Sequence, residues 1–187
     1  SCNARIMDVK TLYTLIAIAD RGSFAEASKV LDISLSAVSM QMRDIFARYS
    51  NLVEPISIDE AYLDVTEPIH GPPSATLIAK RIRSEIKRET GLTVTAGVSY
   101  CKFLAKLASG MRKPDALNVI LKEDADGILR ELPVERFHGI GPRTAARLHA
   151  IGIRTGADLR ALSMEQLQHR FGKQGEHYYR LVRGIDE

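Results

Sequence analysis

The feature that most constrains this chain is a pair of adjacent carboxylates at a bend between two strand-like segments. Residues 53–58 and 61–66 have alternating, β-rich character, so Asp59 and Glu60 are predicted at or near the turn of a hairpin. Neighbouring strand residues point to opposite faces, but at a bend both carboxylates can reach one cation. Because oxygen ligands suit Mg²⁺, the pattern predicts a metal site, with an exposed acidic turn as the alternative.

Composition sets broad limits on the fold and the partners. The chain has 187 residues, of which 45% are hydrophobic, enough for one ordinary domain or two small ones. A net charge of +3 permits nucleic-acid binding without requiring it. Cys2 and Cys101 are far apart and outside any metal-ligand spacing, which suits free thiols in a reducing compartment. With no secretory signal or membrane-spanning apolar run in view, we expect a cytoplasmic protein, and we treat residues 1–6 as a candidate cloning remnant.

Residues 7–45 have the pattern of three short helices. Apolar residues from Leu12 to Ala19 recur at helical spacing, Ser23 is placed to cap a helix over residues 24–31, and Ser34 or Ser36 to cap a third helix ending near Ile45. Together with Asp20-Arg21-Gly22-Ser23-Phe24, this pattern resembles the DNA-binding head of LysR-type transcription regulators, a helix-turn-helix. That resemblance implies that the third helix enters the major groove, so the polar residues available to DNA would be Ser36, Ser39, Gln41 and Arg43. The alternatives are a solvated polar face and a third helix that packs against the following sheet.

The middle of the chain is predicted to alternate helices and strands. Ser74 caps an amphipathic helix that ends at Gly91, a strand follows over residues 92–99, then a helix over 102–111 and a strand over 117–120. With the hairpin, this order is most of a ferredoxin-like unit that lacks its first strand, so we expect an exposed sheet edge. The basic residues of the first helix are expected to face water; they are Lys80, Arg81, Arg83, Lys87 and Arg88.

The last segment contains a tight glycine hairpin between two predicted helices. Gly139, Ile140 and Gly141 precede Pro142, which suits the first turn of a helix. Glycines let the backbone approach a phosphate, and free amides at a helix N-terminus favour an anion. Residues 136–187 contain nine basic and five acidic residues. The pattern predicts phosphate binding, with a glycine-closed packing turn as the alternative; the residues expected to bind DNA are Gly139, Ile140, Gly141, Arg143 and Thr144.

Residues 45–55 and the segment Ser57–Thr66 resemble the catalytic hairpin of Y-family translesion DNA polymerases, the DNA polymerase IV group especially, and the resemblance continues in order to the C-terminus. It implies a partial palm over residues 46–124 and a thumb over 125–187. It also implies that Asp59 and Glu60 are catalytic Mg²⁺ ligands, and that Lys113, which precedes a proline, contacts the triphosphate of a deoxynucleotide. The hairpin near Gly139 would track primer–template DNA in the minor groove.

One part of the family pattern is missing from the sequence. The resemblance implies a first palm strand with an Asp-x-Asp motif followed by aromatic residues, and this chain has none; Asp20 aligns with that ligand only if its segment is extended. Because a two-metal site that lacks one carboxylate loses rate, we expect nucleotidyl transfer to be impaired or absent. Three hypotheses remain: a Y-family polymerase, a non-catalytic DNA-binding module, and a LysR-type regulator.

The predicted fold class is therefore α+β. It comprises an N-terminal three-helix helix-turn-helix unit over residues 7–45, a partial ferredoxin-like palm with an antiparallel sheet, and an all-α thumb with a helix-hairpin-helix. An exposed palm edge and a LysR-like head would both favour a homodimer.

Overall fold

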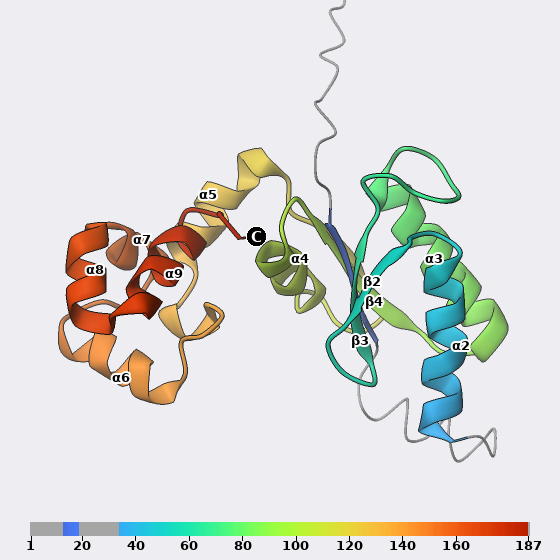
Figure 1. Ribbon diagram of the computed structural model, residues 1–187, viewed down its shortest axis with the longest axis horizontal. Coiled ribbons are helices and arrows are strands. Elements are labelled where there is room, and N and C mark those ends of the chain that lie inside the picture. Colours follow the sequence, from blue (N-terminus) through green and yellow to red (C-terminus); the bar gives the residue numbers. More distant parts are fainter. Residues whose placement is uncertain (1–12, 19–33, 187) are drawn as a thin grey trace, which may run out of the picture. The chain divides into compact units, whose positions relative to one another are not determined.

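A computed structural model describes residues 13–18 and 34–186 of the chain (Figure 1). The described residues up to Val119 form one compact unit, and those from Ile120 onward form a second. Each unit has its own buried core and is described separately.

The first unit is built on a five-stranded sheet with strand order β2-β3-β1-β4-β5. Strands β1, β2, β3 and β4 pair antiparallel along this order, whereas β4 and β5 are parallel, so the sheet is mixed and not purely antiparallel as predicted. The bounds are β1 Tyr13–Ile18, β2 Leu52–Pro55, β3 Glu60–Asp64, β4 Val94–Ser99 and β5 Leu117–Val119.

The prediction of a helix at Leu12–Ala19 was wrong, because Tyr13–Ile18 form a central strand. Tyr13 lies opposite Asp64 of β3 and Ser99 of β4, and Ala17 lies opposite Glu60. The prediction of a missing first strand was also wrong, and the sheet edges are β2 and β5. Hydrophobic periodicity cannot distinguish a helix from a strand in an apolar run as short as Tyr13–Ile18. Pairing with the distant strands β3 and β4 makes this run a strand.

Helices cover both faces of this sheet (Figure 1). On one face lie α2, Leu35–Ala47, and α3, Ala75–Thr90; on the other lies α4, Lys102–Ser109. Ser34 caps α2 by accepting a hydrogen bond from the Ala37 amide at 3.1 Å, and Ser74 caps α3, which ends at Gly91 with φ 72°, as predicted. The α2 side chains that join the core are fully or almost fully buried; they are Val38, Met42, Ile45 and Phe46.

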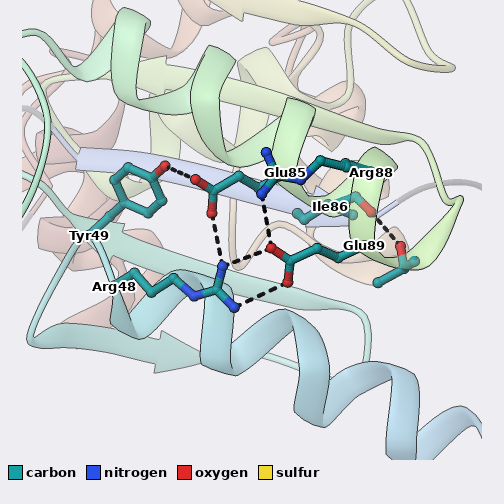
Figure 2. A network of polar contacts seen from close by, with 7 residues as sticks. Arg48, Tyr49, Glu85, Ile86, Arg88 and Glu89 are labelled. Atoms are coloured by element: carbon teal, nitrogen blue, oxygen red, sulfur yellow. Dashed lines mark hydrogen bonds and ion pairs between the residues drawn. The ribbon is translucent and has the colours of Figure 1, made fainter.

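A polar network joins the end of α2 to α3 (Figure 2). The Arg48 guanidinium donates to Glu85 at 3.3 Å and to both oxygens of Glu89 at 2.8 and 3.1 Å. The Tyr49 hydroxyl donates to Glu85 Oε1 at 2.6 Å. Burial, reinforced by this hydrogen bond to a carboxylate, raises the pKa of Tyr49 to about 12. The end of the third helix of the N-terminal prediction is therefore joined to α3 by charge, in addition to its packing in the core.

Not every basic residue of α3 faces water. Arg83 is half-buried, and it donates from Nε to the Val94 carbonyl at 2.9 Å and from Nη2 to Asp115. The other four basic residues of the predicted face are exposed, as expected. Arg83 therefore ties α3 to the sheet and to the loop before β5.

Helix α4 lies unusually close to β4 because of Gly97. A Cβ atom at Gly97 would stand 2.1 Å from the Ala105 carbonyl oxygen and 2.3 Å from the Ser109 amide nitrogen. No larger residue fits such a contact without moving the helix. This close approach brings the half-buried side chains of Lys102 and Lys106 on α4 near the sheet.

The second unit is all-helical. Its elements are α5 Lys122–Glu131, the 3₁₀ turn η1 Val134–Arg136, α6 Pro142–Ala150, α7 Gly156–Arg160, α8 Met164–Phe171 and α9 Lys173–Leu181. Leu129, Leu148, Leu159 and Leu167 are buried at its centre. Among the helices that the structure describes, none has the length and apolar character needed to cross a membrane.

Candidate metal and nucleic-acid sites

The predicted acidic hairpin is present, with residues 56–59 forming its turn between β2 and β3. The amides of Ile56 and Ser57 donate to the Glu60 carbonyl oxygen at 2.9 and 3.2 Å, which closes the turn. Asp59 is half-buried, and the Ser57 hydroxyl donates to its Oδ1 at 2.6 Å. The turn thus places Asp59 at its end and Glu60 at the start of β3.

Glu60 is also half-buried and is paired with a lysine. Its side chain is 22% exposed, and its Oε2 contacts the Lys106 ammonium of α4. One turn earlier on α4, Lys102 pairs with Glu54 Oε2 of β2 at 2.6 Å, and its Nζ lies 5.7 Å from the centre of the Tyr62 ring. Our sequence interpretation missed both lysines, although their i,i+4 spacing would have placed them on one face of the helix.

The side chains of Glu60, Tyr62 and Asp64 share the sheet face opposite the one where Ala61 and Leu63 are buried. A groove of about 410 Å³ opens on this face, lined by Asn51, Leu52, Val53, Glu54, Tyr62, Asp64 and Lys102. Asp64 lies four strand residues from Glu60, about 13 Å along β3, so these two carboxylates do not share one cation.

The donor set fits a hard cation in kind but supplies only two carboxylates. Asp59 and Glu60 are oxygen donors of the sort that Mg²⁺ prefers. Within residues 13–18 and 34–186, no three His, Cys, Asp or Glu side chains come together in a way that could hold a metal. Ala17 lies opposite Glu60, so the C-terminal end of β1 lies beside the acidic turn. Asp20 follows this strand in the sequence but lies outside the described residues.

Lys113, the predicted triphosphate contact, is exposed in the loop between α4 and β5. The loop is held on both sides of Lys113. The Asn118 side-chain amide donates to the Met111 carbonyl at 2.6 Å, and Arg83 Nη2 donates to the Asp115 carbonyl at 2.8 Å. Lys113 thus projects from an anchored loop, and its role stays a prediction.

The glycine hairpin in the second unit has a defined backbone. Gly139 has φ 83°, a left-handed conformation that favours glycine, and its carbonyl accepts a hydrogen bond from the Tyr178 hydroxyl at 3.0 Å. The first intrahelical bond of α6 runs from the Ala145 amide to the Gly141 carbonyl at 2.9 Å, so the Arg143 and Thr144 amides precede the hydrogen-bonded part of the helix.

The predicted DNA-binding residues of this hairpin differ in exposure. Gly139, Gly141 and Arg143 are exposed, and Thr144 is half-buried. Ile140 is only 5% exposed, and its amide donates to the Phe137 carbonyl at 3.0 Å. Its side chain therefore belongs to the core, and the DNA contact expected at this position of the hairpin stays a prediction.

The structure does not support the helix-turn-helix interpretation of the N-terminal region. Its first helix is a strand, its second helix at residues 24–31 lies outside the described residues, and its third helix packs on the sheet. Ser39 is buried, and its hydroxyl donates to the Ile58 carbonyl at 2.7 Å, so it is not available to DNA. Ser36, Gln41 and Arg43 are exposed on α2.

An α+β sheet unit with an acidic hairpin at one strand end, followed by an all-helical unit with a helix-hairpin-helix, defines the palm-and-thumb class of nucleic-acid polymerases. Residues 6–110 match the impB/mucB/samB family, and residues 135–186 match the thumb domain of DNA polymerase iota. The chain belongs to the impB/mucB/samB family and is a Y-family protein similar to DNA polymerase IV.

Similar proteins include two bacterial relatives. The chain is 52% identical over 151 residues to DNA polymerase IV 2 of Agrobacterium fabrum, covering 81% of this chain, and 57% identical over 148 residues to DNA polymerase IV of Streptococcus suis, covering 79%. It spans 42% of the length of each of these relatives.

Solved structures show the same fold at lower identity. DinB from Sulfolobus solfataricus matches with a TM-score of 0.79, and a structure described as a Dbh ternary complex matches with 0.82. Each has 22% identity, and each match covers 95% of this chain and 68% of the other.

Proposed function

We propose that this chain binds primer–template DNA, as the palm and thumb of a Y-family translesion polymerase do. The observation that carries the proposal is the exposed hairpin at Gly139–Gly141, whose backbone leads into the unbonded amides of α6. Backbone amides at a helix N-terminus bind phosphate without reading bases. The local excess of basic over acidic residues, nine against five in residues 136–187, supports the same ligand.

Nucleotidyl transfer is a second candidate function, favoured by the position of β1. The sequence predicted that the first palm strand was missing, which counted against a metal site. Strand β1 is present, and its Ala17 pairs with Glu60 next to the acidic turn. In this proposal Asp59 and Glu60 hold Mg²⁺, and Lys113 binds the triphosphate. When bound, Mg²⁺ would activate the attacking hydroxyl and neutralise charge on the leaving pyrophosphate. We expect the rate to be impaired, because the sequence lacks the Asp-x-Asp motif with following aromatic residues.

The test is binding of a fluorescent primer–template duplex across a salt series, with and without Mg²⁺, followed by addition of nucleotides to the same tubes. We expect affinity to fall steeply as salt rises, because phosphate contacts release counterions. Affinity that does not change with salt would contradict DNA binding through phosphates.

Matched variants test which residues contact DNA and which residues hold the metal. Arg143→Gln should weaken binding, whereas Lys122→Gln, which removes the same charge from exposed α5, should not. If primers grow, Asp59→Asn and Glu60→Gln should each abolish growth while leaving duplex affinity unchanged. Asp20→Asn then tests whether a third carboxylate contributes. Primer growth at the wild-type rate in Asp59→Asn and Glu60→Gln would contradict the metal-site assignment. The homodimer stays a prediction, which sedimentation would test.

A further inference from the structure

The second unit contains a cationic groove at the opposite end of α6 from the glycine hairpin. The groove, which we call the α6–α8 groove, has a volume of about 500 Å³ and is lined by Arg147, Ala150, Ile151, His169, Arg170 and Phe171. Two of these residues carry a permanent positive charge, and none of the six is acidic. Its walls therefore combine positive charge with an apolar surface.

Arg147 is held in position by contacts at the end of α8. Its Nη2 donates to the Arg170 carbonyl at 2.8 Å, and its Cζ lies 4.9 Å from the centre of the Phe171 ring. The hydrogen bond satisfies a carbonyl at the end of α8. Among the described residues it is the one hydrogen bond that the structure shows for the guanidinium, which has five N–H donors. Because the side chain is already ordered, an anion that binds it pays little further conformational entropy.

The groove lies on the same face of α6 as the hairpin contact. Arg143, Arg147 and Ala150 are spaced i, i+4 and i+7, so they form one stripe along the helix. Arg143 and Arg147 are both exposed, and their Cα atoms are separated by about 6 Å along the helix axis. Phosphates of one DNA strand advance by about 3.4 Å along the duplex axis, so this separation matches about two nucleotides.

We propose that the α6–α8 groove is a second phosphate-binding site for the DNA backbone that the hairpin holds, with Arg147 and Arg170 as its ligands. The inference rests on the proposed DNA binding and extends it along α6. An acidic peptide with an apolar anchor is the competing occupant, since the groove also exposes Ile151, which is 43% exposed. The stripe that joins the groove to Arg143 favours DNA.

The experiment measures duplex affinity against salt for Arg147→Gln and Arg170→Gln, with Lys122→Gln as the control. Arg170→Gln keeps the backbone carbonyl that Arg147 binds, so it removes charge without removing that contact. We expect each groove variant to lose about threefold to tenfold in affinity at low salt and to reduce the salt slope by about 0.9, equally for different duplex sequences. Thermal unfolding identifies any Arg147→Gln protein that has simply lost structure.

The outcomes separate the inference from the proposed function. An unchanged slope in Arg170→Gln, with a reduced slope in Arg143→Gln, would overturn the second site while leaving the hairpin contact in place. Wild-type affinity that does not depend on salt would instead overturn DNA binding itself. A labelled peptide of alternating glutamate and leucine that binds wild-type protein but not Arg170→Gln, while duplex affinity is equal in both, would assign the groove to a protein partner.

Discussion

The Lys106 ammonium contacts the carboxylate of Glu60, one of the two candidate metal ligands. A cation that binds Glu60 would meet the positive charge of Lys106 at the same oxygen. A divalent cation and a unit charge about 4 Å apart repel by about 2 kcal/mol in water, which corresponds to about thirtyfold in affinity. The pair therefore links the metal affinity of the acidic turn to a residue on a different element.

Lys106→Met should tighten binding of Mn²⁺, a spectroscopic substitute for Mg²⁺, by about thirtyfold in an electron paramagnetic resonance titration. Lys102→Met is the matched control, because Lys102 occupies the same helix face but pairs with Glu54 at 2.6 Å. Equal effects of the two substitutions would show that general surface charge, and not the contact with Glu60, sets the affinity. Loss of Mn²⁺ binding in Glu60→Gln would confirm that the titration reports the acidic turn.

Gly97→Ala should destabilise the first unit by about 3 kcal/mol, since the new Cβ would overlap the Ala105 carbonyl and the Ser109 amide. Urea unfolding followed by circular dichroism measures the change. Gly127→Ala is the comparison, because it lies inside α5 and a Cβ there would meet nothing within 4 Å. It should raise stability by about 0.5 kcal/mol, as expected for alanine in a helix. A mild effect at Gly97 would mean that α4 can move away from β4.

Tyr178→Phe removes the hydroxyl that donates to the Gly139 carbonyl but keeps the ring that packs edge-on against Phe171. We expect a stability loss of about 1 kcal/mol and weaker duplex binding, because the hairpin backbone loses its support. Tyr179→Phe serves as the control, since its ring, which stacks on Arg183, is retained. If Tyr178→Phe lowers stability but leaves duplex affinity unchanged, the Tyr178 hydroxyl supports the fold and plays no part in DNA binding.

Stability should fall at alkaline pH through Tyr49. Because the pKa of Tyr49 in the folded protein is raised from its ordinary value near 10 to about 12, the folded state holds this proton more tightly than the unfolded chain. The contribution is fully present below pH 10 and is lost as the pH rises to about 12. Unfolding measured across this range should show the loss in wild-type protein and a smaller loss in Tyr49→Phe. A difference in phenolate absorbance between wild-type and Tyr49→Phe protein that develops near pH 10, and not near 12, would contradict the raised pKa of Tyr49.

The sequence predicted those helices and turns that have a clear capping residue or a clear hydrophobic periodicity. A capping serine or a glycine with positive φ marks the start or end of an element to within a few residues. The bounds of α3 were predicted in this way from Ser74 and Gly91, and the thumb hairpin from the glycines near residue 140. The acidic turn was found for the same reason, since it lies between two adjacent strands.

Features that depend on distant residues were not predictable in this way. The run at Tyr13–Ile18 is apolar without alternation, and what makes it a strand is pairing with β3 and β4, far along the chain. The ion pair between Lys106 and Glu60 likewise depends on how closely α4 approaches β4 at Gly97. Burial of Ser39 followed from α2 packing on the sheet, which a resemblance to another helix could not show.

The place of β1 in the sheet also bears on how the first unit is made during synthesis. Among the strands that the structure describes, β1 comes first in the sequence and lies between two later ones, with Tyr13 paired to both Asp64 and Ser99. Contacts between residues so far apart close large loops and slow folding. On a ribosome, β1 must therefore remain unpaired until β3 emerges, and its second edge stays open until Ser99 has been added.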